Sequence, residues 1–207
     1  MGVDSTTVLK HLNQRGRASV RVESKKLYNG GLFIADIAHM PSSVCGVWPA
    51  FWTSGQQNWP DDGEIDILEN ISEAQQNAVT LHTGKQDCLV SKSAQGGSLV
   101  TSHCSNYYTD YVTQFQNQGC SVASTDSANN YGDGFNSVGG GIYALVRTNR
   151  RLRQCLLTFT LGMDWNFNQG LELPSHQFSW HQRIERTSRP VHMGQGNYHH
   201  RWRLLRR

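Results

Sequence analysis

The chain has 207 residues and a mass of 23.3 kDa, which is enough for one domain with a sizeable core. Twenty glycines, six tryptophans and only 17% charged residues, with a net charge of +3, are typical of a β-rich, loop-rich protein. No stretch approaches the length of a transmembrane helix, and the first residues lack the basic and apolar regions of a signal peptide.

Short strands separated by turn signals follow one another through the first 146 residues, which contain no convincing helical pattern. Alternating polar and apolar residues, or short apolar runs after glycines, mark each strand. This succession predicts an all-β sandwich. The predicted strands cover residues 19–24, 32–38, 47–53, 64–69, 77–83 and 141–146.

One predicted strand is unusually acidic, with five acids in the nine residues from Asp61 to Glu69. Strand alternation places Glu64 and Asp66 on one face. Glu69 would fall on the opposite face unless a β-bulge inserts one residue and shifts the phase. A solvated acidic surface and a helix are alternatives from spacing alone, whereas the apolar residues between the acids argue against a calcium loop. Paired carboxylates on one face would suit hydrolysis of a sugar linkage.

A long segment from residue 84 to residue 140 is rich in Ser, Asn, Gln and Gly. Disulfide pinning and a role in shaping a binding cleft would account for such a long connection. The chain has no C-x-x-C pair and no zinc-like spacing, so we expect neither a metal site nor a cofactor. Two disulfides are possible among the first four cysteines, in three connectivities, which favours an oxidising compartment. The five cysteines are Cys45, Cys88, Cys104, Cys120 and Cys155.

The composition changes sharply near residue 147. Residues 1–146 contain eight Lys and Arg against thirteen Asp and Glu, whereas residues 147–207 contain eleven Arg, no Lys and three acids. One interpretation is a basic arm for nucleic acid or another anionic surface. We favour the other, a segment of different origin such as translation in another frame, because its Arg, Trp, His and Leu residues show no periodicity.

Three blocks of sequence resemble glycoside hydrolase family 16, and are most similar to its fungal laminarinase, or endo-1,3(4)-β-glucanase, branch. They are WPAFW at 48–52, GEIDILE at 63–69 and TLHTG at 80–84. The extra residue in the E-x-D-x-x-E pattern distinguishes this branch from bacterial lichenases with E-x-D-x-E. The resemblance covers about residues 2–149.

The resemblance implies a concanavalin A-like β-jelly-roll sandwich with a substrate cleft across its concave sheet, and a retaining mechanism. Matched by position, Glu64 resembles the nucleophile and Glu69 the general acid/base, while Asp66 resembles the residue that tunes their protonation. A retaining enzyme needs one ionised and one protonated carboxyl group. A third carboxylate between them would help to separate their pKa values.

Four further residues are candidates for substrate binding. Trp48, Trp52 and Trp59 could stack on glucosyl rings, although Trp52 could equally lie in the core. His82 resembles a cleft histidine that contacts the substrate or a catalytic carboxylate. A lone strand histidine is more often an ordinary polar group, so this expectation rests on the family pattern.

The sequence departs from the family at both ends. Strands that normally precede the position of Met1 are missing, and after Leu145 the usual aromatic strand is replaced by Arg-rich sequence. We therefore expect a partial catalytic domain over 1–149, an incomplete jelly roll, and a tail over 150–207 that is disordered or not native-like.

The expected function is retaining hydrolysis of internal β-1,3 and mixed β-1,3/1,4 glucan linkages. The alternative is a non-catalytic glycan-binding or inactive remnant of such an enzyme. The expected partner is a β-glucan polysaccharide, with neither nucleic acid nor membrane. The resemblance further implies an extracellular monomer.

Overall fold

A computed structural model describes residues 4, 6–8, 17–55, 57–85, 88–90, 97–125 and 129–147, and the backbone of three later strands. Within these residues the chain forms strands and one short helix. The first strands are β1 (Val20–Glu23), β2 (Gly31–Ile37), β3 (Val47–Ser54), β4 (Glu64–Glu69) and β5 (Ala78–His82). The later elements are β6 (Ser98–Thr101), β7 (Cys120–Ala123), α1 (Gly132–Ser137), β8 (Gly141–Arg147), β9 (Arg151–Leu157), β10 (Gly162–Asn166) and β11 (Gln177–Ile184).

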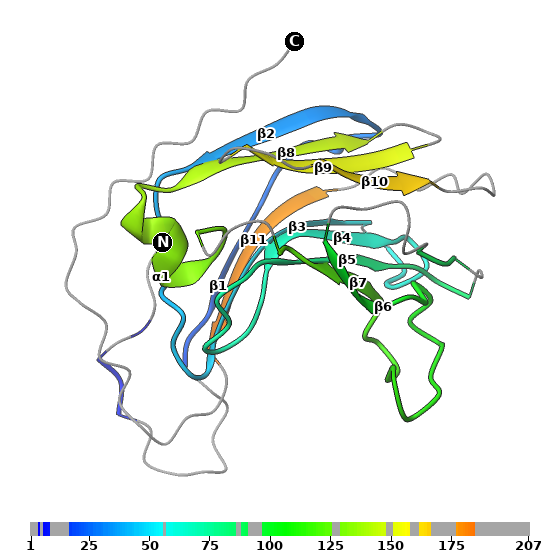
Figure 1. Cartoon of the computed structure of the whole chain (residues 1–207), viewed down its shortest axis with the longest axis horizontal. Coiled ribbons are helices and arrows are strands. Elements are labelled where there is room, and N and C mark those ends of the chain that lie inside the picture. Colours follow the sequence, from blue (N-terminus) through cyan, green and yellow to red (C-terminus); the bar gives the residue numbers. More distant parts are fainter. Residues whose placement is uncertain are drawn as a thin grey trace.

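The strands form two antiparallel sheets stacked as a sandwich (Figure 1). The larger sheet has the order β1-β11-β3-β4-β5-β7-β6, and the smaller has the order β10-β9-β8-β2. The predicted all-β sandwich is therefore confirmed. No helix among the described residues is both long and apolar enough to cross a membrane.

The acidic strand β4 lies inside the larger sheet and supplies part of the core. Its apolar residues Ile65, Ile67 and Leu68 are at most 2% exposed. They belong to the same buried cluster as Phe33 of β2 and Leu145 of β8 in the smaller sheet. Burial of each such side chain stabilises the fold by about 1.5–3 kcal/mol. The core thus fixes which residues of β4 face inward and leaves its acids on the outer face.

The short helix α1 corrects the prediction of no helix in this region. Its sequence, GDGFNS, has no apolar periodicity, so it gives no helical signal. Tertiary contacts hold it instead. Phe135 is fully buried, and the Asn136 side chain accepts a hydrogen bond from the Met40 N–H and donates one to the Met40 carbonyl, both at 2.9 Å.

The backbone of the Arg-rich segment contributes to both sheets. Strand β9 pairs with β8 and β10, and β11 pairs with β1 and β3. The domain boundary near residue 149 and the non-native character of residues 150–207 stay predictions.

One disulfide is present among the described residues, between Cys104 and Cys120. Cys45 is an exposed free thiol, and Cys88 is a buried one whose pKa burial raises to about 11. The possible second disulfide among the first four cysteines is therefore not formed. The side chain of Cys155 lies outside the described residues.

The Cys104–Cys120 bond closes the loop of residues 105–119, at the end of the large sheet beside β6 and β7 (Figure 1). This agrees with the expected pinning of the long polar segment.

Candidate active site

A β-bulge in β4 brings the three acids together. Asp66 is opposite Thr80 of β5, and Glu69 is opposite Ala78, so three steps along β4 match two along β5. On the other side, β3 keeps its regular alternation while β4 gains one residue. Because directly opposed residues share a face, the extra residue returns Glu69 to the face of Glu64 and Asp66. The predicted bulge is confirmed.

Asn77 satisfies the backbone groups that the bulge leaves unpaired. Its Oδ1 accepts a hydrogen bond from the N–H of Glu69 at 2.8 Å, and its Nδ2 donates to the carbonyl of Ile67 at 2.9 Å. The side chain of Asn130 in turn accepts from the N–H of Asn77 at 2.8 Å, and Asn77 is 1% exposed. Asn77 thus replaces the missing strand partner at the bulge and holds the backbone of Glu69 in place.

We expect Asn77→Ala to lower the free energy of unfolding by about 3 kcal/mol, because two buried backbone groups lose their partners. This corresponds to a fall in Tm of about 6–12 °C, measurable by calorimetry. Asn70→Ala is the matched control, because the Asn70 side chain, directly after β4, also bonds two backbone groups, but exposed ones: it donates to the carbonyl of Gln76 and accepts from the N–H of Ile71. An equal loss in both variants would contradict the role of Asn77.

Two indole side chains donate hydrogen bonds to the carboxylates. The indole N–H of Trp59 donates to Oε2 of Glu64 at 2.6 Å, and that of Trp48 donates to Oε1 of Glu69 at 2.5 Å. These contacts are on the two outer acids of the row.

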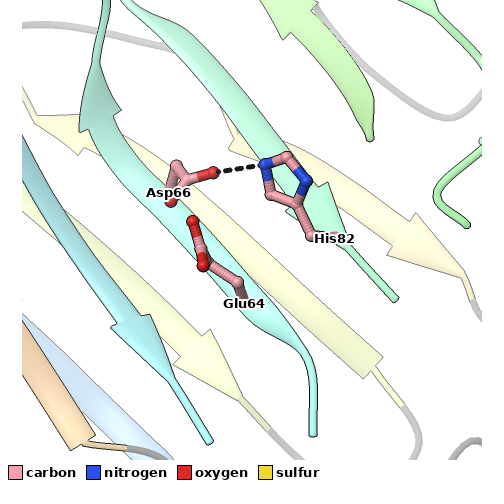
Figure 2. A group of neighbouring side chains, drawn as sticks. All are labelled: Glu64, Asp66 and His82. Carbon is pink, nitrogen blue, oxygen red and sulfur yellow. Dashed lines mark ion pairs between the residues drawn. The ribbon is translucent and has the colours of Figure 1, made fainter. Parts of the chain in front are cut away.

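The central acid is paired with a histidine from the neighbouring strand. Nε2 of His82 lies 3.1 Å from Oδ2 of Asp66, which is 1% exposed. Figure 2 shows the His82 ring on β5 directed at the Asp66 carboxylate on β4, with Glu64 beside them. The potential ligand atoms of these three residues lie within 4.8 Å of one another, but they already contact one another, and we base no metal site on them.

Burial and mutual repulsion raise the pKa of all three acids. Burial raises the pKa of Glu64 to about 8, and the charge of Asp66 adds to the effect. Burial likewise raises the pKa of Glu69 to about 7, against the lowering effect of the Trp48 hydrogen bond. The pKa of Asp66 is well above its usual value, chiefly through burial and then through the charge of Glu69. The cluster therefore keeps at least one proton near neutral pH, as a general acid requires.

Trp52 differs from the other candidate residues. Its indole N–H is buried with no hydrogen-bond partner, and the guanidinium of Arg21 lies over its ring, 4.4 Å from the centroid. A face covered by Arg21 is not offered to a sugar. Trp59, by contrast, is 51% exposed while its N–H bonds Glu64. Stacking of the tryptophans on substrate stays a prediction.

The geometry agrees with the comparison with known families. Residues 1–157 match the family described as XgeA-like, catalytic GH16 domain, which covers more than half of the chain. The chain belongs to glycoside hydrolase family 16.

Known members of the family are similar over most of the chain. A probable endo-1,3(4)-β-glucanase of Aspergillus niger is 46% identical over 153 residues, which are 74% of this chain but 19% of that protein. An elongating GH family 16 β-1,3-glucosyltransferase superposes with a TM-score of 0.72 at 33% identity, over 89% of this chain and 65% of that one.

Laminarinase 16A of Phanerochaete chrysosporium, solved with β-glucans in its donor and acceptor sites, gives a TM-score of 0.72 at 28% identity. That match covers 88% of this chain and 66% of the laminarinase chain. The likeness to solved family members supports the jelly-roll prediction.

Sequence reasoning missed two asparagines of this family 16 site. Asn77 could have been suspected, because a bulge leaves a backbone N–H and a backbone carbonyl unpaired, and an amide side chain can accept from the first and donate to the second. Asn106, whose Oδ1 lies 2.7 Å from Nδ1 of His82, had no such signal in a segment rich in Asn and Ser. The direct bonds from Trp48 and Trp59 to the acids were also not foreseen.

Proposed function

We propose that this chain is a retaining endo-β-glucanase domain that cleaves internal β-1,3 and mixed β-1,3/1,4 linkages. The observation that supports it most is the gathering of Glu64, Asp66 and Glu69 on one sheet face by the bulge, with raised pKa values. The chain spans only about a fifth of the Aspergillus niger protein, so this proposal concerns the glycosidase domain alone.

In the proposed reaction, the ionised Glu64 attacks the anomeric carbon while Glu69 donates its proton to the leaving glycosidic oxygen. The bond between the anomeric carbon and that oxygen breaks, leaving a glucosyl ester on Glu64. Glu69, now ionised, then takes a proton from water as the water oxygen bonds to the anomeric carbon. This step breaks the ester, frees Glu64 and restores the proton on Glu69 with net retention of configuration.

The two indole donors support these roles. Trp59 holds one oxygen of Glu64 through a hydrogen bond that favours the ionised carboxylate, which leaves the other oxygen for the anomeric carbon. The pKa of Glu64 is nevertheless above that of Glu69, the reverse of the order that the roles require in isolation. Asp66 lies between the two glutamates and interacts with both. We therefore assign the raised pKa values to the cluster as a whole and not to single acids.

We further propose that the exposed ring of Trp59 stacks on a glucosyl unit next to the scissile bond, because it lies directly beside Glu64. The Cys104–Cys120 disulfide supports an extracellular location, since disulfides persist in oxidising compartments.

The test is the stereochemistry of the first product. Incubated with laminarin or a mixed-linkage glucan, the purified chain is expected to release sugars whose new reducing ends are initially β, as seen by proton NMR before mutarotation. Initial α products would refute the retaining mechanism. Binding of laminarin without any release of reducing sugar would favour the non-catalytic alternative.

Replacing Trp59 by phenylalanine tests its N–H separately from its ring. We expect Trp59→Phe to lower kcat/KM on laminarin by about 10–100-fold, since a hydrogen bond to a charged group contributes about 1.5–3 kcal/mol. The acid limb of the pH profile should move upward, because the bond that favours ionised Glu64 is gone. Trp52→Phe is the control, because its N–H bonds no carboxylate among the described residues. Equal effects of the two changes would count against the proposal.

A further inference from the structure

Asn106 reaches the site from the loop that the Cys104–Cys120 disulfide closes. Its backbone N–H donates to the carbonyl of Thr83 at 3.0 Å, and its carbonyl accepts from the N–H of Asn117 at 2.9 Å. The residue is 1% exposed. The loop thus holds Asn106 rigidly beside β5, next to the residue that follows His82.

The same loop encloses the outer edge of the His82 ring. Oδ1 of Asn106 lies 2.7 Å from Nδ1 of His82, and Gly119 approaches the ring as well. A Cβ atom at Gly119 would lie 2.7 Å from Nδ1, and its φ of +65° also favours glycine. The loop therefore fits against the ring closely enough to select its orientation.

Within the described part of the chain, the charged groups recorded as interacting with His82 are the acids of β4. Nε2 lies 3.1 Å from Oδ2 of Asp66, and the charge of His82 lowers the pKa of both Glu64 and Glu69. The ring of Trp59 lies 6.2 Å away, centroid to centroid, and contributes no charge. His82 thus interacts with three acids, and the positions of its ring protons affect the ionisation of each of them.

An amide oxygen can only accept, so a hydrogen bond from Nδ1 to Oδ1 requires the hydrogen on Nδ1. Nε2 then presents a lone pair to Asp66 unless the ring is cationic. Two states satisfy the contact: an imidazolium with ionised Asp66, or a neutral imidazole accepting a hydrogen bond from protonated Asp66. In both, one proton lies between the two residues and the pair has no net charge.

We propose that Asn106 is a positioning residue that holds His82 in its Nδ1–H form and so keeps one proton shared with Asp66. The consequence of this arrangement rests on the proposed function: because the His82–Asp66 pair has no net charge, Glu64 can ionise without another negative charge beside it. Without the Asn106 oxygen, a neutral His82 can place its hydrogen on Nε2 and donate to ionised Asp66. The pair then has a charge of −1, which opposes ionisation of Glu64.

The direct test is NMR of the full chain with ¹⁵N-labelled histidine, in which long-range ¹H–¹⁵N correlations report the ring tautomer. The His82 signals are assigned by their loss in His82→Gln. We expect Nδ1 to be protonated in the parent chain and Nε2 to be protonated in the neutral ring of Asn106→Leu. A neutral parent ring whose only hydrogen is on Nε2 would overturn the proposal even if no variant folds.

Two further variants separate positioning from general support of the loop. Asn106→Asp keeps an acceptor opposite Nδ1 and should retain the parent tautomer. Gln114→Leu removes a buried loop anchor whose side chain bonds the backbone of His103 and Gly119, not the ring of His82. It should loosen the loop but leave the tautomer unchanged. A tautomer change in Gln114→Leu as large as in Asn106→Leu would reduce Asn106 to a structural role.

The consequence is measured without turnover, by ¹³C NMR titration of the Glu64 carboxyl group. We expect the midpoint to rise by about one pH unit in Asn106→Leu, as for a nearby like charge. The acid limb of kcat/KM on laminarin should follow. An unmoved midpoint despite a changed tautomer would overturn the inference, whereas a fully active Glu64→Gln variant would overturn the proposed function and leave the tautomer result standing.

Discussion

Replacing Glu64 by glutamine is expected to lower kcat on laminarin by about 10³-fold or more, because the amide cannot form the glucosyl ester. The substitution keeps the size of the side chain and an oxygen that can accept from the indole N–H of Trp59. Affinity for laminarin should therefore persist, which a pull-down of the polysaccharide can measure. Turnover close to that of the parent would rule out Glu64 as the nucleophile.

Replacing Glu69 by glutamine should give a different kinetic pattern. Loss of the general acid slows cleavage of a glucan by about 10²–10⁴-fold. A substrate with a good leaving group, such as a dinitrophenyl β-laminaribioside, needs little protonation and should still form the glucosyl ester. Breakdown of that ester then limits the rate, and added azide should accelerate it and yield a β-glycosyl azide.

Asp61→Asn is the matched control for both changes. Asp61 belongs to the same acidic run but lies in the turn before β4, outside the carboxylate row. It should retain the activity of the parent. If azide gave the β-glycosyl azide with Glu64→Gln and the α-glycosyl azide with Glu69→Gln, the two roles would have to be exchanged.

The sequence was most informative where a local irregularity had one simple structural explanation. An offset of five between Glu64 and Glu69 on an alternating strand allows both to share a face only with an inserted residue, and the bulge is present. The apolar residues of the strand fix its orientation, because Ile65 and Ile67 must enter the core. Strand position and facing thus follow from periodicity over a few residues.

Contacts between distant segments were not predictable in the same way. The bond from Trp59 to Glu64 depends on where the turn before β4 places the indole ring, and the bond from Trp48 to Glu69 depends on how β3 lies against β4. Nothing in the local spacing specifies either placement. Asn106 lies 24 residues after His82, in a segment whose composition favours no particular pairing. Helix α1 was missed for a similar reason, since tertiary hydrogen bonds to Met40 stabilise it.

The stability of the fold should decrease as pH rises from about 5 to 8. A carboxyl group whose pKa is raised in the folded state is protonated there while the unfolded chain is already ionised, so folding binds protons. The contribution is complete below the unfolded value of 4.5 and is lost as pH passes the folded pKa values of the cluster, about 7 to 8. Tm measured by calorimetry across this range should therefore fall.

Glu64→Gln should remove much of this slope, because the amide stays neutral at every pH. We expect the variant to equal the parent near pH 4.5 and to exceed it at pH 8 by about 3 kcal/mol, or about 6–12 °C in Tm. Asp110→Asn provides a control in the opposite window. Hydrogen bonds from Thr113 and from the backbone of residues 112–114 hold the pKa of Asp110 below its usual range, so its contribution is lost only as pH falls below about 4.

The two substitutions should therefore alter opposite ends of the stability profile. A parallel shift of the whole profile in Glu64→Gln would mean that the buried acids are not the source of the slope. The same acids would then not hold the proton that the proposed mechanism requires near neutral pH. The measurement thus tests the protonation of the three buried acids independently of turnover.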